Sequence, residues 1–367
     1  MDGILLLYKQ DDITSSNIVE KISKNFSIKC GHTGTLDRAA EGLLILTLGK
    51  ATRFTQYFQH LGKQYLARGK LGIVTDTYDR NGRVIATSDF IPTDEQIKEA
   101  ILSFIGKSEQ IPPSYSSKWV NGERAYRLAK KGENFKLKPK VVEISNIEIL
   151  DIAYPYFEIK VDCSSGTYIR SLIKDIGDKL SSGAYMSYLK RTKIGDFDIS
   201  KSYKLDDILN MSKDQFEKLL ISPSDALYFF KPLLLDDENI DRFKKGQKVK
   251  IPDQLKDFRY FPSQIFSDNY FDDLKHIKNG NENCSADNFN EISSIRGSHY
   301  GKNNYESKND RSYDNELSDG GFYRTGNDIF KVIDKKGNFI IYVSRKVASL
   351  IKFHFLFLYK CLIFQNY

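Results

Sequence analysis

Apolar residues recur at the intervals of strands and helices up to about residue 228, and this patterning is then broken. Residues 259–321 are dominated by Asn, Asp, Ser, Gly and Tyr and have no apolar periodicity. Such a segment buries too little apolar surface to offset the entropy of ordering it, so we interpret it as a disordered insertion. The chain therefore divides into a folded unit at 1–228, a second unit at 229–345 that the insertion interrupts, and an apolar tail at 346–367.

The first unit combines short apolar strands with amphipathic helices, which predicts an α+β fold. Ser15 or Ser16 is expected to cap the first helix and Thr93 the third. In the second unit, 330–334 and 338–343 flank a Lys-Lys-Gly turn, a pattern typical of a hairpin in a small β-rich domain. The first unit's predicted strands are 3–8, 65–72, 143–150 and 156–163, with a strand or buried turn at 41–48, and its predicted helices are 14–26, 52–61, 93–105 and 168–180.

Features that bear on compartment favour a cytoplasmic protein. The apolar run in MDGILLLYKQDD is too short for a signal peptide. Lys352, His354 and Lys360 interrupt the apolar tail, whereas a membrane span needs about 20 nearly continuous apolar residues, so we expect no membrane partner. The 4 Cys residues are too few for a disulfide scaffold and show no metal-site spacing. We therefore expect reduced thiols and no metal.

Charge and aromatic content point toward a polyanion. The 55 Lys and Arg residues against 48 Asp and Glu give a net charge of +7, which favours nucleic acid or an anionic membrane surface as a partner. Residues 112–140 interleave basic and aromatic side chains between Pro and Gly residues. Cations bind phosphates and aromatic rings stack on unpaired bases, so this segment is typical of a projecting RNA-contacting loop, although a solvated basic face explains the residues equally well. The side chains concerned are Tyr115, Lys118, Trp119, Arg124, Tyr126, Arg127, Lys130 and Lys131.

The segment CGHTGTLD at 30–37 places His32 and Asp37 on one glycine-containing irregular loop. Glycine lets a backbone turn sharply or approach a ligand closely. Asp37 is then either a nucleophile or general base, or the cap of a helix that opens at Arg38. On residue chemistry alone the cap is the better interpretation. Neither a phosphate-binding GxxxxGK[ST] loop nor a GxGxxG pattern is present, so ATPase and dinucleotide hypotheses are weak.

Two further polar clusters follow predicted strands. Residues 71–82 contain Asp76 and Asp79 near Thr and Gly, which suits either a metal or arginine partner or a simple polar turn. Residues 161–170 lead from a strand through a polar turn into a helix, with Tyr168 and Arg170 in its first turn. These two side chains either face a site at the strand end or are a buried tyrosine and an exposed arginine. Cys163 is either a nucleophile or, more commonly for a thiol in a strand, part of the core.

Five blocks in this order, taken together, make the chain resemble the TruB-type tRNA pseudouridine synthases, over about residues 1–228. The resemblance implies an enzyme that isomerises the uridine at position 55 in the T-loop of tRNA to pseudouridine. It also implies the pseudouridine synthase fold, which is a central, largely antiparallel sheet flanked by helices, with a cleft across it and a small PUA-like C-terminal domain. The blocks are GHTGTLD (31–37), KQYLARGKLGIVTDTYDRNG (63–82), PPSYSSKWVNGERAYRLAKKG (112–132), CSSGTYIRSLIKDIG (163–177) and GAYMSYLKRTKIG (183–195).

The same resemblance implies the charged residues of the site. The nucleophile falls on Asp37, its arginine partner on Arg170, and an aspartate that supports the arginine on Asp79. One departure is that the family usually has Pro after the nucleophile, where this chain has Arg38. Because proline restricts the backbone, its loss is expected to loosen the loop and to affect rate more than identity.

The residues expected around the target base come from three other blocks. Tyr65 matches the tyrosine that stacks on the flipped base, and Tyr168 the second active-site tyrosine. Leu189 matches a leucine that lines the pocket, and His32 a histidine that contacts the RNA beside the base. Ser165 replaces the usual basic residue of its block, which removes one possible phosphate contact.

Pseudouridine formation exchanges a C–N for a C–C glycosidic bond on the same sugar, so we expect no cofactor. The expected partner is the T-arm of tRNA, bound by a monomer. Asp37 either attacks the sugar C1′ or takes part in a glycal route, in which Tyr65 is the candidate base. Two rival hypotheses remain: a non-catalytic tRNA-binding or folding protein in which Asp37 is a cap, and an RNA methyltransferase that uses Cys163.

Overall fold

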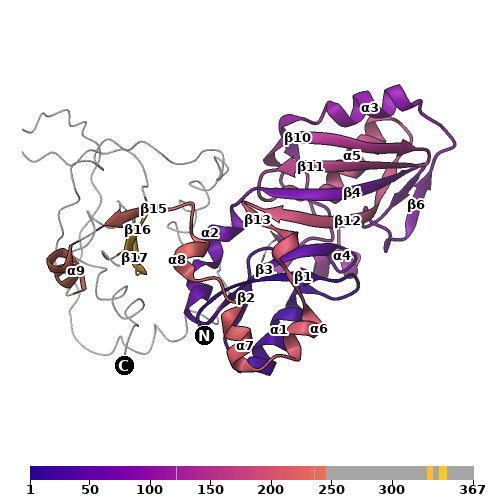
Figure 1. Ribbon diagram of the computed structural model, residues 1–367. Helices are drawn as coiled ribbons and strands as arrows, with labels where there is room; N and C mark the ends of the chain where they lie inside the picture. Colours follow the sequence, from indigo (N-terminus) through magenta and orange to yellow (C-terminus); the bar gives the residue numbers. More distant parts are fainter. Residues whose placement is uncertain (121, 235, 245–328, 334–338, 345–367) are drawn as a thin grey trace, which may run out of the picture.

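A computed structural model describes residues 1–120, 122–234, 236–244, 329–333 and 339–344 (Figure 1). The expected insertion at 259–321 and the tail at 346–367 lie outside these residues. The helices are α1 Ser15–Phe26, α2 Thr55–Gln59, α3 Asp94–Leu102, α4 Ala125–Lys130, α5 Ile169–Lys179, α6 Leu205–Leu209, α7 Lys213–Lys218, α8 Pro223–Ala226 and α9 Asp237–Lys244, with 3-10 turns η1 Gly49–Phe54 and η2 Ile199–Lys201. The strands are β1 Gly3–Lys9, β2 Cys30–His32, β3 Glu41–Leu48, β4 Lys63–Leu71, β5 Ile73–Thr75, β6 Val84–Thr87, β7 Gly106–Gln110, β8 Trp119–Val120, β9 Glu123–Arg124, β10 Lys140–Ala153, β11 Tyr156–Cys163, β12 Ala184–Ile194, β13 Phe197–Asp198, β14 Tyr203–Lys204, β15 Lys231–Leu234, β16 Ile329–Ile333 and β17 Phe339–Ser344.

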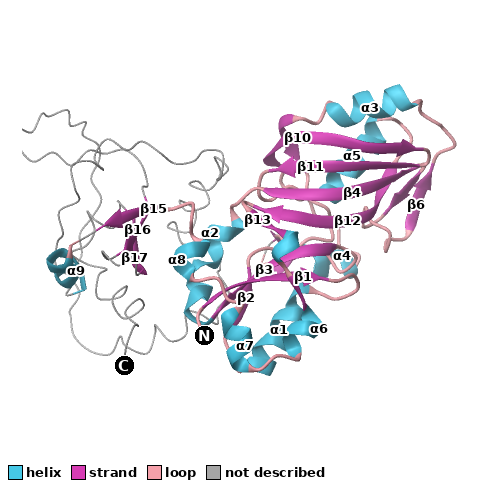
Figure 2. Cartoon of the chain, in the orientation of Figure 1, coloured by secondary structure: helices cyan, strands magenta, loops and turns pink. Residues whose placement is uncertain are grey.

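One large sheet organises residues 1–204. Its strands lie in the order β14-β1-β3-β12-β4-β11-β10-β7, with β2 added beside β3 and β13 beside β12. The pairs β1–β14 and β3–β12 are parallel, and the remaining pairs along this order are antiparallel. Helices flank the sheet, as Figure 2 shows. The prediction of a central, largely antiparallel sheet in an α+β fold is therefore confirmed.

Strand β12, which the apolar pattern did not reveal, joins the two halves of this sheet. It pairs antiparallel with β4, and on its other edge Lys190 lies opposite Glu41 and Arg191 opposite Gly42 of β3. Gly42 has a φ of 114°, and a Cβ atom there would lie 2.3 Å from the main-chain oxygen of Arg191. Glycine is needed where β3 pairs with β12, because it tolerates positive φ and carries no side chain.

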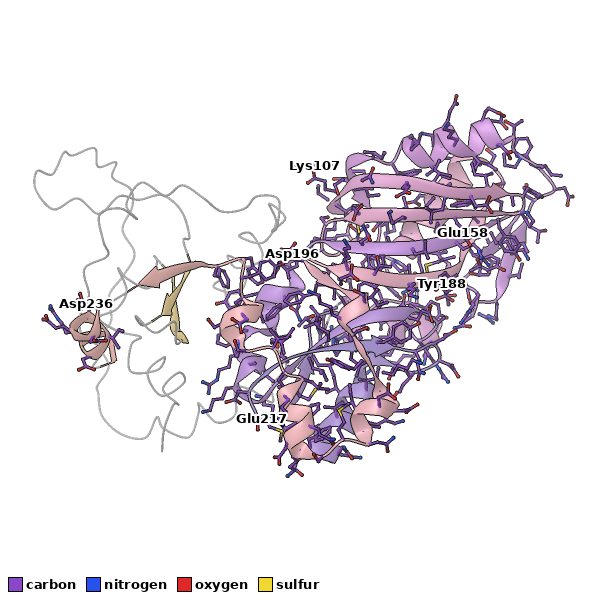
Figure 3. The ribbon with its side chains drawn as sticks, in the orientation of Figure 1. Lys107, Glu158, Tyr188, Asp196, Glu217 and Asp236 are labelled. Atoms are coloured by element: carbon purple, nitrogen blue, oxygen red, sulfur yellow. The ribbon has the colours of Figure 1, made fainter. Side chains whose placement is uncertain are left out.

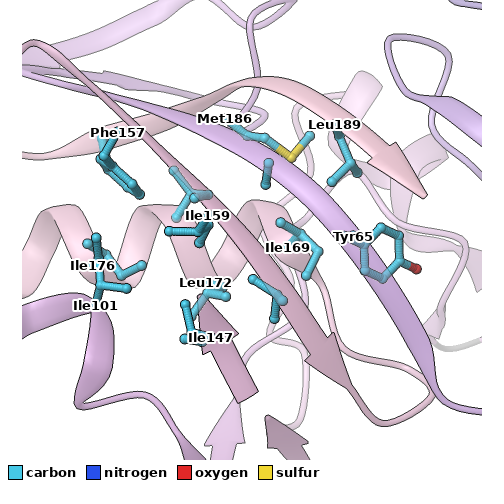
Figure 4. Packing of buried hydrophobic residues seen from close by; sticks show 14 of the residues in the cluster. Tyr65, Ile101, Ile147, Phe157, Ile159, Ile169, Leu172, Ile176, Met186 and Leu189 are labelled. Carbon is cyan, nitrogen blue, oxygen red and sulfur yellow. The ribbon is translucent and has the colours of Figure 1, made fainter. Parts of the chain in front are cut away.

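The largest apolar cluster lies between the sheet and helices α3 and α5 (Figure 4). Alternate residues of β11, such as Ile159 and Val161, are fully buried because successive strand residues face opposite sides. Leu172 and Ile176 of α5 meet them at helical spacing, as the sequence predicts. Burying each such side chain contributes about 1.5–3 kcal/mol, so this cluster fixes where α5 begins.

The other face of the sheet is more open to solvent. On β4 the exposed Arg68 pairs with Glu158 of the neighbouring β11. The Tyr188 hydroxyl of β12 donates to the carboxylate of Glu41, and Figure 3 labels Glu158 and Tyr188 on this part of the sheet. The Arg68–Glu158 pair fits the alternation of β4, whose odd-numbered residues are buried and whose even-numbered residues are not.

Several local predictions are decided by the caps. α1 begins after Thr14, whose side-chain oxygen accepts a hydrogen bond from the Asn17 N–H at 3.1 Å. The prediction of Ser15 or Ser16 as the cap was therefore wrong. Ser15 is buried instead, and its hydroxyl oxygen accepts from the Leu36 N–H at 3.1 Å. Thr93 caps α3 as predicted, in a capping box with Gln96.

The remaining predictions for the second unit are tested in part. β16 and β17 pair antiparallel, with Phe330 opposite Val343, which confirms the two strands of the expected hairpin. β15 adds to β16 in parallel. Assignment of 229–345 to a PUA-like domain stays a prediction, as do the domain limits. Among the helices that the structure describes, none has the length and apolar character required to span a bilayer.

Candidate active site

Asp37 lies on the loop between β2 and β3 and forms a bidentate ion pair with Arg170. The Arg170 Nε lies 2.8 Å from Asp37 Oδ2, and Arg170 Nη2 donates to Oδ1 at 3.1 Å. The Arg170 side chain is only 4% exposed, whereas the Asp37 side chain is 38% exposed. The carboxylate is therefore accessible from solvent while its partner is held inside the protein. Paired, charge-assisted hydrogen bonds of this kind fix the orientation of a carboxylate.

Arg170 is itself held by three other groups. Its Nη1 donates to the Thr77 carbonyl at 3.0 Å, and its Nη2 to the Tyr115 carbonyl at 2.9 Å. Asp79 Oδ2 lies 3.8 Å from Nη1. Arg170 occupies the first turn of α5, directly after the polar turn that ends β11. The interpretation of Arg170 as an exposed arginine was therefore wrong.

The loop after β5 brings Asp79 to this guanidinium. Asp79 is 8% exposed, and its Oδ1 accepts from the Thr77 hydroxyl at 2.8 Å and from the Asn81 N–H at 3.0 Å. Tyr78 between them has a φ of 60°, so the loop turns sharply before Asp79. Asp79 thus belongs to a structured turn that closes on Arg170 rather than to a turn with no partner.

Two buried basic residues, Lys9 and Arg191, hold the Asp37 loop through hydrogen bonds to its main-chain carbonyls. Lys9 of β1 donates from Nζ to the carbonyls of Arg38 (3.2 Å) and Ala40. Burial lowers the pKa of Lys9 from 10.5 to about 8. Arg191 of β12 donates to the carbonyls of Leu43 at 2.8 Å and Gly34 at 3.0 Å. Neither side chain is more than 1% exposed, so the loop is anchored at both ends.

The loop contains no helix at Arg38. Residues 38 and 39 form a turn, and the Ala40 N–H donates to the main-chain carbonyl of Asp37 at 3.0 Å. The Asp37 side chain is directed to Arg170 rather than to a helix N-terminus. The interpretation of Asp37 as a helix cap is therefore wrong.

Tyr65 and Leu189 lie at one edge of the main apolar cluster. Tyr65 is 9% exposed and Leu189 6% exposed, and they come from the neighbouring strands β4 and β12. Figure 4 shows the Tyr65 hydroxyl directed away from the apolar side chains. Burial raises the pKa of Tyr65, and the charges of Arg191 and Asp37 are near enough to affect it. Tyr65 is thus a largely buried ring whose hydroxyl points out of the apolar cluster.

Tyr168 directly precedes α5 and is half-buried. Its N–H donates to Gln110 Oε1 at 2.7 Å, and its carbonyl accepts from Gln110 Nε2 at 3.1 Å. Burial raises the pKa of its hydroxyl, which also lies within reach of the charges of Arg170 and Asp37. The side chain of Gln110, at the end of β7, therefore fixes the backbone from which Tyr168 and Arg170 project.

His32 is the last residue of β2, and within the part of the chain that the structure describes it forms no hydrogen bond or ion pair with Asp37. Burial, followed by the charge of Arg191, lowers the pKa of His32 from 6.5. Among the described residues its buried Nδ1 has no hydrogen-bond partner. The structure therefore brings Asp37 and Asp79 to Arg170, whereas His32 lies close enough to Arg191 for that charge to affect its pKa.

Residues 112–140 contain a short hairpin, β8–β9, and helix α4. Trp119 is 51% exposed, and the Arg124 guanidinium lies 4.1 Å from its ring centroid. Lys131 pairs with Glu123 at 2.9 Å, which ties α4 to the hairpin. The segment touches the site through the Tyr115 carbonyl, so an exposed aromatic and basic surface begins beside Arg170.

The structure does not favour a cysteine nucleophile at position 163 or a metal site among the described residues. Cys163 is 5% exposed at the end of β11, its Sγ lies 3.7 Å from the Lys63 carbonyl, and burial raises its pKa to about 12. A thiol of this kind is not a thiolate nucleophile at neutral pH. Within the part of the chain that the structure describes, no group of three or more His, Cys, Asp or Glu side chains is arranged to hold a metal ion.

Comparison with known proteins identifies the family. A model of the TruB family pseudouridylate synthase N-terminal domain matches residues 21–169, and a model of the tRNA pseudouridylate synthase B C-terminal domain matches residues 170–228. tRNA pseudouridine synthase B of Clostridium tetani is 42% identical over 252 residues, which cover 68% of this chain and 86% of that protein. The chain belongs to the TruB family of pseudouridine synthases. It is therefore an isomerase that binds RNA.

Further relatives agree with this family. tRNA pseudouridine synthase B of Borreliella burgdorferi strain ZS7 is 36% identical over 266 residues, 72% of this chain and 92% of that protein. The crystal structure of a Cbf5-Nop10-Gar1 complex contains a similar fold, with a TM-score of 0.53 and 25% identity over 67% of this chain and 68% of that one. The two TruB models meet between Ile169 and Arg170, so the Asp37–Arg170 ion pair joins one matched region to the other.

Residue-level reasoning missed Lys9, Arg191 and Gln110. A signal existed for Arg191, because it follows Leu189 by two residues on one strand and so shares its inward face. Lys9 ends the apolar strand β1, where a charged residue is usually taken as the point at which the chain reaches solvent. Gln110 carried no signal, because its partner Tyr168 is 58 residues away in sequence.

Proposed function

We propose that this protein converts the uridine at position 55 in the T-loop of tRNA to pseudouridine, with Asp37 as the nucleophile. The observation that carries the proposal is the bidentate contact of an accessible carboxylate with a buried guanidinium, 133 residues apart in sequence. The curated relatives are named tRNA pseudouridine synthase B, which favours tRNA as the substrate class. Asp37, oriented by its two contacts with Arg170, suits covalent catalysis.

The chemistry needs only groups on the enzyme and the nucleotide. In one route the Asp37 carboxylate attacks C1′ and the N1–C1′ bond breaks, with its electron pair going to the uracil. The uracil then turns, its C5 attacks C1′ and displaces the carboxylate, and the proton lost from C5 is balanced by a proton gained at N1. In the other route, the N1–C1′ bond breaks and a base takes the C2′ proton, which gives a glycal. C2′ then regains a proton as C5 of the turned uracil bonds to C1′ and gives up its own proton, while N1 is protonated. Tyr65 is the candidate base in that route, because its hydroxyl points out of the apolar cluster and the charge of Asp37 is near enough to affect its pKa.

The target base must leave the RNA stack to reach Asp37. Turning out a base costs a few kcal/mol, which stacking and phosphate contacts offset. We assign the stacking role to Tyr65, since an aromatic–base stack contributes about 1–3 kcal/mol. Tyr168 and Leu189 are proposed to bound the base on its other sides, and His32, with its unpaired Nδ1, to contact the RNA beside it.

Residues 112–140 and the β-rich C-terminal unit are proposed to bind the tRNA. Trp119 and Arg124 offer an exposed stacking surface, and the exposed Lys130 of α4 a phosphate contact. The T-arm is the expected region of contact, because its loop contains the target base. We further propose that the protein acts as a cytoplasmic monomer. Asp79 is assigned a supporting role, through its approach to Arg170.

Asp37→Asn tests the proposal. The amide keeps the size of the side chain but removes the nucleophile, so the variant should fold, bind tRNA with unchanged affinity and form no pseudouridine. The assay is release of tritium from 5-³H-uridine in a tRNA transcript, followed by mapping of the modified position, with no added cofactor. Measurable turnover would remove Asp37 from the nucleophile role. Modification only at another uridine would reject position 55 while leaving the family chemistry intact.

The same assay separates the rivals. A tRNA-binding or folding protein without catalysis would leave the transcript unchanged in wild type as well as in the variant. An RNA methyltransferase would add mass to the RNA in the presence of S-adenosylmethionine, whereas pseudouridine formation leaves mass unchanged. The burial and raised pKa of Cys163 count against the methyltransferase.

A further inference from the structure

The two aspartates that approach Arg170 are each followed by an arginine. Asp37 precedes Arg38 and Asp79 precedes Arg80. Both arginines turn away from Arg170 and pair with adjacent residues of one acidic turn, at residues 11 and 12 between β1 and α1. We call this segment, Asp11–Asp12, the acidic turn.

Arg38 is joined to the acidic turn on both its side chain and its backbone. Its Nε lies 2.7 Å from Asp12 Oδ1 and 3.2 Å from the Asp12 carbonyl. In the reverse direction, the Asp12 N–H donates to the Arg38 carbonyl at 2.9 Å. That carbonyl also accepts from Lys9 at 3.2 Å, so the peptide between Arg38 and Ala39 is held from two sides.

Arg80 completes the connection. Its Nη2 donates to the Asp11 carboxylate, whose other oxygen accepts from the Asp12 N–H at 2.7 Å. The contacts therefore form a closed ring. It runs from Arg170 through Asp37 and Arg38 to the acidic turn, and returns through Arg80 and Asp79 to Arg170.

We propose that Asp11 and Asp12 are positioning residues that hold the Asp37 loop and the Asp79 loop at a fixed separation, and so set the angle at which Asp37 meets Arg170. The two loops lie at residues 33–40 and 76–82. Of the contacts described above, only those with Arg170 would join them if this connection were absent. Because the side chains of Asp12 and Arg38 are 81% and 63% exposed, the pair contributes little to overall stability. Its effect should therefore appear in turnover rather than in folding.

This inference rests on the proposed catalytic role of Asp37. The test compares wild type with Asp12→Asn, Asp11→Asn/Asp12→Asn, Arg38→Gln and Arg38→Gln/Asp12→Asn. Asparagine is the appropriate replacement because Asp12 has a φ of 64°, a conformation that Asn adopts readily and Ala does not. Glu20→Gln is the matched control, since it removes one partner of an exposed ion pair, with Lys24, on α1.

The readouts are kcat and KM for pseudouridine formation on a tRNA transcript, and the urea midpoint of unfolding. An exposed pair changes an equilibrium by at most about fivefold, so we expect kcat to fall about three- to fivefold in Asp12→Asn and about tenfold in the double Asp variant. KM and the urea midpoint should stay at the wild-type values. Arg38→Gln/Asp12→Asn should be no slower than the slower of its two single variants, because both changes remove the same contact.

Wild-type activity distinguishes the two proposals. If wild type forms pseudouridine and the Asp variants match it in kcat, the positioning role is overturned while the proposed function stands. A rise in KM for Arg38→Gln, with no effect of Asp12→Asn, would also overturn it, because Arg38 would then act by binding RNA directly. Failure of wild type itself to form pseudouridine would reject the proposed function first.

Discussion

Replacement of Arg170 by lysine keeps the positive charge but removes the planar fork. The guanidinium makes four short contacts, two with Asp37 and one each with the carbonyls of Thr77 and Tyr115, at 2.8–3.1 Å. A lysine ammonium is a single nitrogen, so it cannot reach both Asp37 oxygens and the two carbonyls on either side. We expect at least two of the four contacts to be lost in Arg170→Lys.

The magnitude follows from the burial of these groups. A hydrogen bond to a charged group contributes about 1.5–3 kcal/mol, so two lost contacts would cost about 3–6 kcal/mol if fully buried. Asp37 is 38% exposed, and solvent screens its part of the interaction, which lowers the expected loss to about 2–4 kcal/mol. A domain of ordinary stability, about 5–15 kcal/mol, would still fold. Displacement of the carboxylate by about 1 Å should reduce turnover about 10²-fold.

The assay is urea unfolding followed by far-UV circular dichroism, together with single-turnover pseudouridine formation at saturating enzyme. The matched control is Arg68→Lys, because Arg68 pairs with Glu158 on the open face of the same sheet and is 49% exposed. The control should change stability by less than about 0.5 kcal/mol and leave turnover unchanged. A stability and turnover for Arg170→Lys equal to those of the control would refute the argument that bidentate geometry, rather than charge, holds Asp37.

Three more predictions concern separate parts of the protein. Tyr65→Phe should keep tRNA affinity and slow turnover about 10²-fold if the hydroxyl moves a proton, and an unchanged rate would show that it has no chemical part. Lys130→Glu should weaken tRNA binding and reduce its salt slope by about 1, whereas Lys21→Glu on α1 should not; equal salt slopes would exclude α4 from the RNA contact. The folded pKa of Lys9, about 8, lies below its ordinary 10.5, so between these values the unfolded chain binds more protons and stability rises with pH. Lys9→Met should flatten that rise in urea midpoints measured from pH 8 to 10.5, and an unchanged slope would contradict it.

Local signals in the sequence were sufficient for most elements that pack against a neighbour close in the chain. The Ile and Leu spacing of α5 and the alternation of β11 predicted both elements to within a few residues. The 52–61 helix was only partly right, since 3-10 geometry at Gly49–Phe54 precedes α2. β12 escaped detection because polar and basic residues interrupt its apolar positions, and their partners, such as the carbonyls beside Arg191, come from distant segments.

At the site, the contrast between local signals and contacts across long stretches of sequence is larger. Residue chemistry alone favoured a cap at Asp37 and left Arg170 open between an exposed arginine and one that faces a site, because each was weighed against its neighbours in sequence. Their pairing depends on a contact across 133 residues, which no local pattern encodes. Resemblance over five ordered blocks supplied that long-range information. The resemblance did not include the supporting roles of Lys9 and Arg191. These roles follow from the hydrogen bonds that the two side chains donate to carbonyls of the Asp37 loop and of β3.

The geometry of the ion pair depends on how neighbouring strands of the sheet are aligned. The loop that carries Asp37 leads directly into β3, and the helix that carries Arg170 leads into β12. Gly42 at the start of β3 lies opposite Arg191 of β12, Arg191 lies opposite Tyr65 of β4, and Tyr65 lies opposite Val161 of β11. The start of β3, which follows the Asp37 loop, and the end of β11, which precedes Arg170, therefore lie in nearly the same row across the sheet. Arg191 reinforces this alignment by donating to a carbonyl of β3 and to one of the Asp37 loop. The accessible carboxylate can therefore lie on an irregular loop and still be oriented, because the register of the sheet places the start of β3 near the end of β11, and Lys9 and Arg191 hold the loop between them.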